Sequence, residues 1–120
     1  MEYTNASNAK EAKQLYIVRN AVDFIQDNYF EKLTLPYLAS KFSISPNYFS
    51  KIFKQHIGMP PIEYIMRTRV EKSIYYLNNG FSVQEASEEV GFSDQFYFSR
   101  IFKKIKGTNP ANYKVPGDYI

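Results

Sequence analysis

The sequence contains one short segment twice, and this internal repeat limits the possible folds more than any other feature. Residues 49–54 (FSKIFK) recur 49 positions later as residues 98–103 (FSRIFK), whereas the preceding Ser45 and Ser93 are 48 positions apart. The second copy therefore has one extra residue. Such a repeat predicts two copies of one supersecondary unit, a short helix, a tight turn and a longer helix. Beyond each copy, three further residues match at the same shift of 49: Gly58 with Gly107, Pro61 with Pro110, and Tyr64 with Tyr113.

The spacing of apolar residues predicts that the regular structure is helical. Val18, Ala21 and Ile25 follow the helical i, i+3, i+7 pattern, which predicts a helix over about residues 12–28. We therefore predict an all-α fold of about seven helices, with two helix-turn-helix subdomains joined by a long linker helix. The predicted segments are a flexible N-terminal segment or linker (1–12), the first subdomain (13–59), the linker helix (60–79), the second subdomain (80–114) and a tail (115–120).

Residues that start and end helices frame both copies. Serine and threonine hydroxyls accept hydrogen bonds from the free N–H groups of a first helical turn, and Ser82 with Glu85 matches the capping-box pattern. Glycine ends helices because it tolerates the left-handed conformation of the C-cap region. The predicted caps are Thr34, Ser45, Ser82 and Ser93 at helix starts and Gly58 and Gly107 at helix ends. The short helix that starts at Thr34 is predicted to end near Phe42.

The longer helix of each copy has an apolar face, assigned to the core, and a polar face without acids. Residues 46–59 and residues 95–106 contain cations but no Asp or Glu. Amides, hydroxyls and cations are the groups that pair with base edges and phosphates. The pattern therefore favours two helices that read DNA in the major groove. The outward residues are Asn47, Ser50, Lys51 and Lys54 in the first copy and Gln95, Phe96, Ser99, Arg100 and Lys103 in the second.

The composition narrows the function classes. The chain has no cysteine, one histidine and no glycine-rich phosphate loop, so we expect no metal, no cofactor and no enzyme activity. No segment approaches the roughly 20 consecutive apolar residues that span a bilayer. The absence of cysteine fits a cytoplasmic location. The net charge of +3 is a weak indication of an acidic partner by itself, so the distribution of charge decides the interpretation.

In its two repeated helix-turn-helix segments, the chain resembles the DNA-binding domain of the AraC/XylS family of bacterial transcription regulators. The resemblance covers residues 18–114 and is most specific in the second copy. It implies a bilobal all-helical protein that places each recognition helix in a major groove and activates or represses transcription. The matching stretches of the second copy are residues 90–94 and 97–104, Gly107, Pro110 and Tyr113. The matching residues of the first copy and the linker helix are Leu38-Ala39, Phe42, Ser45, residues 49–54, Gly58, Tyr64-Ile65 and Arg69.

Positions that match the family imply the DNA contacts given below, and the other roles are expected from the residue types and their places in the chain. Phe96 has two open interpretations, contact with a thymine methyl or packing beside the turn. His56 is expected near a phosphate or as a cationic cap of its helix. Base contacts are expected from Asn47, Ser50, Lys51, Gln95, Phe96, Ser99 and Arg100. Contacts with the DNA backbone are expected from Ser45, Lys54, Ser93 and Lys103. Arg69 is expected to form a structural salt bridge with an acid, and Tyr64 and Tyr113 to be structural.

Two positions depart from the family pattern. Ser73 replaces a usual alanine, and Ala86-Ser87 replaces a large aliphatic residue followed by alanine, so we expect looser packing there.

Family regulators usually have a further effector or receiver domain, so the chain is either a stand-alone member or the C-terminal output domain of a longer regulator. The expected partner is double-stranded DNA, with no small-molecule effector in this segment, no membrane, and a monomer in isolation. The alternative function is a protein-interaction module that docks on RNA polymerase or another regulator.

Overall fold

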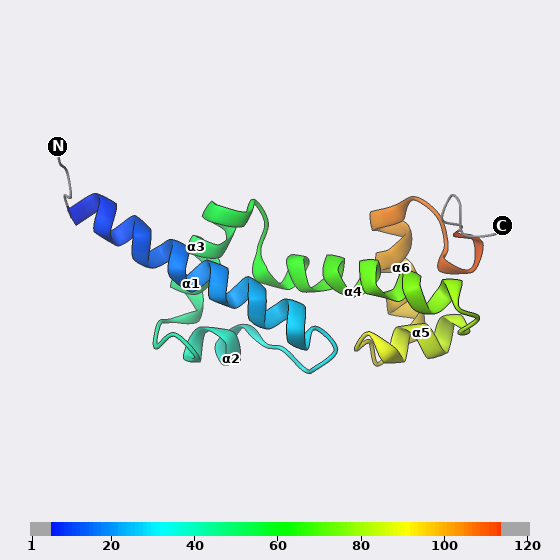
Figure 1. Cartoon of the computed structure of the whole chain (residues 1–120). Coiled ribbons are helices and arrows are strands. Elements are labelled where there is room, and N and C mark those ends of the chain that lie inside the picture. Colours follow the sequence, from blue (N-terminus) through cyan, green and yellow to red (C-terminus); the bar gives the residue numbers. More distant parts are fainter. Residues whose placement is uncertain (1–5, 114–120) are drawn as a thin grey trace. The chain divides into compact units, whose positions relative to one another are not determined.

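The computed structural model describes residues 6–113, and the regular structure of these residues is entirely helical. This confirms the predicted all-α fold, with six α-helices and one 3₁₀ turn in the described part. None of the described helices is both long enough and apolar enough to cross a membrane. In chain order the elements are α1 (Ala6–Asn28), α2 (Leu35–Ser40), α3 (Pro46–Ile57), α4 (Pro61–Asn78), α5 (Val83–Glu89), α6 (Gln95–Lys106) and η1 (Pro110–Asn112) (Figure 1).

The described residues form two compact units. Unit 1 comprises the described residues up to Asn28 together with Leu33–Tyr64, so it contains α1, α2, α3 and the start of α4. Unit 2 comprises Tyr29–Lys32 and the described residues from Ile65 onwards, which include the rest of α4, then α5, α6 and η1. Each unit therefore contains one copy of the sequence repeat.

Unit 1 is built by packing α3 against both α1 and α2. The hydroxyl of Thr34 accepts a hydrogen bond from the backbone N–H of Tyr37 at the start of α2, at 3.2 Å. The hydroxyl of Ser45 accepts one from the N–H of Tyr48 at the start of α3, at 3.1 Å. Both predicted caps are thus confirmed. The buried core comprises Val18, Ala21, Ile25, Leu38, Ala39, Phe49, Ile52 and Phe53.

Unit 2 repeats this arrangement with α5 packed on α6. The predicted capping box is present: Ser82 accepts from the N–H of Glu85 at 3.0 Å, and the Glu85 carboxylate accepts from the N–H of Ser82 at 2.9 Å. The buried apolar cluster comprises Val70, Val90, Phe92, Phe98 and Phe102.

The aromatic contacts show that the repeat is structural as well as sequential. In unit 1 the ring of Phe53 packs edge-on to Tyr64, with 5.7 Å between ring centroids. In unit 2 the equivalent Phe102 and Tyr113 are 5.3 Å apart in the same kind of contact. These T-shaped contacts are a favourable geometry for aromatic pairs. Tyr64 and Tyr113 therefore have the structural role that was predicted.

Three predicted boundaries differ from the structure. Helix α1 begins at Ala6, so residues 6–12, predicted as a flexible segment, are helical. The side chains of residues 8–13 are all exposed, so no apolar periodicity marked this part of the helix. Its alanine, lysine and glutamate residues nevertheless favour helix. Helix α2 ends at Ser40 rather than near Phe42. Residues 1–5 and the predicted tail, residues 115–120, lie outside the described residues.

The third difference concerns the start of α6. Its N-cap is Asp94 rather than Ser93, because the Asp94 carboxylate accepts a hydrogen bond from the N–H of Phe96 at 2.8 Å. Asp94 follows Ser45 by 49 positions, the same shift that relates α3 to α6, so it occupies the capping position that Ser45 has in the first copy.

Arg69 of α4 fastens the segment Tyr29–Lys32 within unit 2. Its Nε donates to the backbone carbonyl of Tyr29 at 2.6 Å, and a terminal nitrogen donates to that of Glu31 at 2.8 Å. The side chain is 7% exposed and its guanidinium lies over the ring of Phe92, 5.5 Å from the centroid. Burial lowers the pKa of Arg69. The residue is structural, as predicted, but its observed hydrogen-bond partners are backbone carbonyls rather than an acid.

Arg69→Met is expected to destabilise unit 2 by about 2–3 kcal/mol, because two charge-assisted hydrogen bonds are lost and two carbonyls lose their donor. Urea unfolding of the chain, followed by circular dichroism, measures this change. Lys72→Met is the matched control, since Lys72 is exposed on the same helix and lies over the Tyr29 ring at 5.7 Å. Equal losses from the two variants would contradict the role assigned to Arg69.

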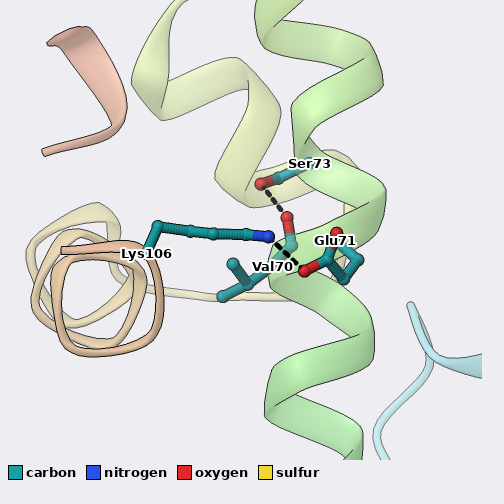
Figure 2. Close-up of polar contacts among 4 residues, drawn as sticks. All are labelled: Val70, Glu71, Ser73 and Lys106. Carbon is teal, nitrogen blue, oxygen red and sulfur yellow. Dashed lines mark hydrogen bonds and ion pairs between the residues drawn. The ribbon is translucent and has the colours of Figure 1, made fainter. Parts of the chain in front are cut away.

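The two polar departures from the family pattern are both buried. Figure 2 shows Ser73 donating its hydroxyl to the backbone carbonyl of Val70, at 2.6 Å. Ser87 donates in the same way to the carbonyl of Gln84, at 2.8 Å. A buried hydroxyl that has a partner costs far less than one without. Beside Ser73, Glu71 forms an ion pair with Lys106 of α6 (Figure 2).

Candidate nucleic-acid interface

The polar face of α3 is assembled by helical periodicity. The predicted contact residues at positions 47, 50, 51 and 54 are spaced i, i+3, i+4, i+7, which places them on one side of a helix. Asn47, Lys51 and Lys54 are exposed and Ser50 is half-buried. The opposite face is buried in the core of unit 1. The structure therefore brings all four residues into one stripe, here called the α3 stripe.

Helix α6 has the same division. The α6 stripe comprises Gln95, Phe96, Ser99, Arg100 and Lys103, of which Phe96, Arg100 and Lys103 are exposed and the other two half-buried. The opposite face packs Phe98 and Phe102 into the core. The buried residues of both helices are apolar, whereas the cations of the two stripes, Lys51, Lys54, Arg100 and Lys103, are exposed.

Phe96 is unusual because a large apolar side chain lies on the polar stripe. It is 69% exposed, the largest value among the exposed hydrophobic side chains of the described residues. A phenylalanine that packed beside the turn would be covered, so its exposure favours the other interpretation, contact with a partner.

Tyr97 was missed by the sequence analysis. It lies three residues before Arg100, and the Arg100 guanidinium is over its ring, 5.6 Å from the centroid. Tyr97 is itself 40% exposed. An aromatic face under a guanidinium restricts where that group points, so Tyr97 orients Arg100. The i, i+3 spacing of the two residues was the signal available in the sequence.

The expected backbone contacts lie at the ends and edges of the stripes. Lys54 and Lys103 are exposed at equivalent positions of the repeat. Ser45 is exposed and uses its oxygen as a cap acceptor, which leaves its O–H to donate elsewhere. Ser93 is exposed, and Asp94 has taken over the cap. All four residues are accessible to a partner.

His56 has a contact that neither prediction anticipated. Its Nε2 is 3.3 Å from the side-chain oxygen of Gln14, so it joins the end of α3 to α1 within unit 1. Among the residues described, no group of three or more His, Asp or Glu side chains could hold a metal ion.

The fold and the two stripes define a class: proteins with two helix-turn-helix units on one chain, each presenting an acid-free helix. A family model described as a helix-turn-helix domain matches residues 38–115. The chain belongs to the AraC/XylS family, as its helix-turn-helix DNA-binding domain.

Known proteins support this assignment. The C-terminal domain of AraT, a response regulator from Geobacillus stearothermophilus, is 33% identical, with a TM-score of 0.77 over 87% of this chain and 90% of that one. The uncharacterized HTH-type transcriptional regulator YpdC from Escherichia coli is 35% identical over 99 residues, 82% of this chain but 35% of that protein. The chain thus spans about a third of the length of this relative.

A further solved structure shares the fold alone. It is the DNA-binding domain of AdpA, a global transcriptional factor, in complex with a target DNA. The identity is 22% and the TM-score 0.74, over 78% of this chain and 86% of that one.

Proposed function

We propose that this chain binds double-stranded DNA sequence-specifically and regulates transcription, with α3 and α6 each entering a major groove. The observation that supports this most is the repetition of the outward stripe. At a shift of 49, Ser50 pairs with Ser99, Lys51 with Arg100, and Lys54 with Lys103. Surface charges with a merely solubilising role would not need the same chemistry at the same helical positions in two units. The DNA complex of AdpA, which shares this fold, supports the same use of it.

The chemistry of the stripes suggests what each residue reads. Arg100 and Lys51 can donate to O6 and N7 of guanine, the commonest specific contact in the major groove. The side-chain amides of Asn47 and Gln95 can each accept from N6 and donate to N7 of an adenine. Phe96 can contact a thymine methyl. Tyr97 holds the Arg100 guanidinium over its ring, which reduces the entropy that this side chain loses on binding.

The test is selection of preferred sites from a random DNA library, followed by affinity against salt for the selected site and for a scrambled one. Two separated sequence boxes are expected, one for each unit, with affinity falling steeply as salt rises. A single box would mean that one unit reads bases and the other only contacts the backbone. No enrichment and a flat salt dependence would overturn the proposal and favour docking on RNA polymerase or another regulator.

Lys54→Ala is expected to weaken binding to the selected and scrambled sites by the same factor. A lysine that contacts a phosphate contributes charge without sequence information, so the slope of log affinity against log salt should decrease by about 1. Fluorescence anisotropy at several salt concentrations measures both quantities. Gln55→Ala is the control, since Gln55 is an exposed neighbour outside the stripe. A loss confined to the selected site would instead assign Lys54 to base reading.

A further inference from the structure

Unit 1 contains a groove that the DNA-binding proposal does not use. It has a volume of about 530 Å³ and lies between α1 and the segment that runs from the end of α2 into α3. This volume is within the range of about 300–1,000 Å³ that small-molecule sites occupy. The residues that matter for its chemistry are Lys10, Lys13, Gln14, Ile17, Phe42 and Tyr48.

The polar groups inside the groove are arranged as a chain of hydrogen bonds. Gln14 is only 8% exposed, and its amide nitrogen donates to the Tyr48 hydroxyl oxygen at 3.0 Å. Its amide oxygen is 3.3 Å from Nε2 of His56, which donates when that nitrogen carries the proton. Because the Tyr48 oxygen already accepts a bond, its hydrogen can be donated to a molecule in the groove. This hydrogen bond fixes the Tyr48 oxygen at the groove and leaves its O–H available as a donor.

The charge on the groove has one sign. Lys10 and Lys13 line it from α1, where their i, i+3 spacing places them on the same side of the helix. Both side chains are exposed, and the lining includes no Asp or Glu. The remaining lining is largely aliphatic and aromatic, with Ile17 and Phe42 half-buried. A lining that combines two lysines, a phenol O–H and apolar side chains complements a molecule with an anionic head and an apolar body.

We propose that this groove binds an amphipathic carboxylate, with the carboxylate near Lys10, Lys13 and the Tyr48 hydroxyl and the hydrocarbon body against Ile17 and Phe42. The proposal departs from the sequence-based expectation that this segment has no small-molecule effector. The proposal does not depend on the proposed DNA binding, because all the residues that it uses belong to unit 1 and its test contains no DNA.

The probes are hexanoate, octanoate and decanoate, each titrated below its micelle concentration into the full chain and followed by NMR and calorimetry. Affinity should rise about threefold to fourfold per added methylene, until the groove is filled. Decanol has the same body without the charge and should bind at least tenfold more weakly. Inorganic phosphate has charge without the body and should cause no saturable change. Absence of saturable decanoate binding, or equal binding of decanol, would overturn the proposal.

Variants test whether binding occurs in this groove. The double change Lys10→Ala with Lys13→Ala should weaken decanoate binding at least tenfold, and Tyr48→Phe by severalfold. Ala12→Phe adds bulk at an exposed lining position and should block the site while the circular dichroism spectrum stays unchanged. Lys104→Ala, in unit 2, is the control and should bind normally. Unaltered binding by the groove variants, or binding only to anionic vesicles and not to monomeric decanoate, would overturn the assignment.

Discussion

Replacing Gly91 with alanine is expected to destabilise unit 2 by about 3–5 kcal/mol, from the conformational cost of a left-handed residue and a steric clash together. Gly91 has φ +104°, a conformation that residues with a side chain rarely adopt. A Cβ atom there would lie 2.9 Å from the backbone oxygen of Phe30, 3.0 Å from its Cα and 3.1 Å from Cζ of Arg69. The first two contacts are with backbone that Arg69 fastens through its hydrogen bonds, so the segment cannot move away cheaply.

Gly107→Ala separates the two causes. Gly107 also has a left-handed φ, +84°, but a Cβ atom there would meet nothing within 4 Å. This variant should therefore lose only the conformational part, about 1–2 kcal/mol. Urea unfolding of both variants, followed by circular dichroism, gives the comparison. If the two lose the same stability, the close approach of Gly91 to Phe30 contributes nothing and the segment is freer than its contacts indicate.

Local sequence patterns were sufficient to predict most of the fold. The helix starts at Thr34, Ser45 and Ser82 depend on hydrogen bonds between residues three apart, so each can be read within one short segment. The start of α6 was predicted one residue early because serine and aspartate both cap well, and propensity alone does not choose between them. The carbonyl partners of Arg69 were not predictable, because they lie 38 and 40 residues away and backbone groups leave no signal in the sequence.

In the candidate DNA interface too, some features could be predicted from local sequence and others depend on tertiary packing. Helical periodicity alone places Asn47, Ser50, Lys51 and Lys54 on one face, so the α3 stripe could be predicted. The exposure of Phe96 depends on what packs beside the turn, and only the structure shows it. The groove of unit 1 could not be predicted, since it joins Lys10 and Lys13 to Tyr48 through a tertiary contact between α1 and α3.

Combining Lys51→Ala with Arg100→Ala is expected to weaken binding to the selected DNA site by about 2–6 kcal/mol, the sum of about 1–3 kcal/mol for each base-reading residue. At about 1.4 kcal/mol for each factor of ten, this is a loss of roughly 30-fold to more than 10,000-fold. The two residues occupy equivalent positions of the repeat but belong to different units. Their losses should add, because each residue is proposed to contact its own bases.

The measurement is fluorescence anisotropy of the two single variants and the double variant, on the selected site and on scrambled DNA. Each single variant should relax sequence preference in one box only, and the scrambled site should lose far less affinity than the selected one. Equal losses on both DNAs would reassign Arg100 and Lys51 to backbone contact. If one single variant binds the selected site with unchanged affinity, and the double variant loses only as much affinity as the other single variant, then only one unit reads bases. The equivalence of the two stripes would then reflect shared ancestry of the units rather than a shared task.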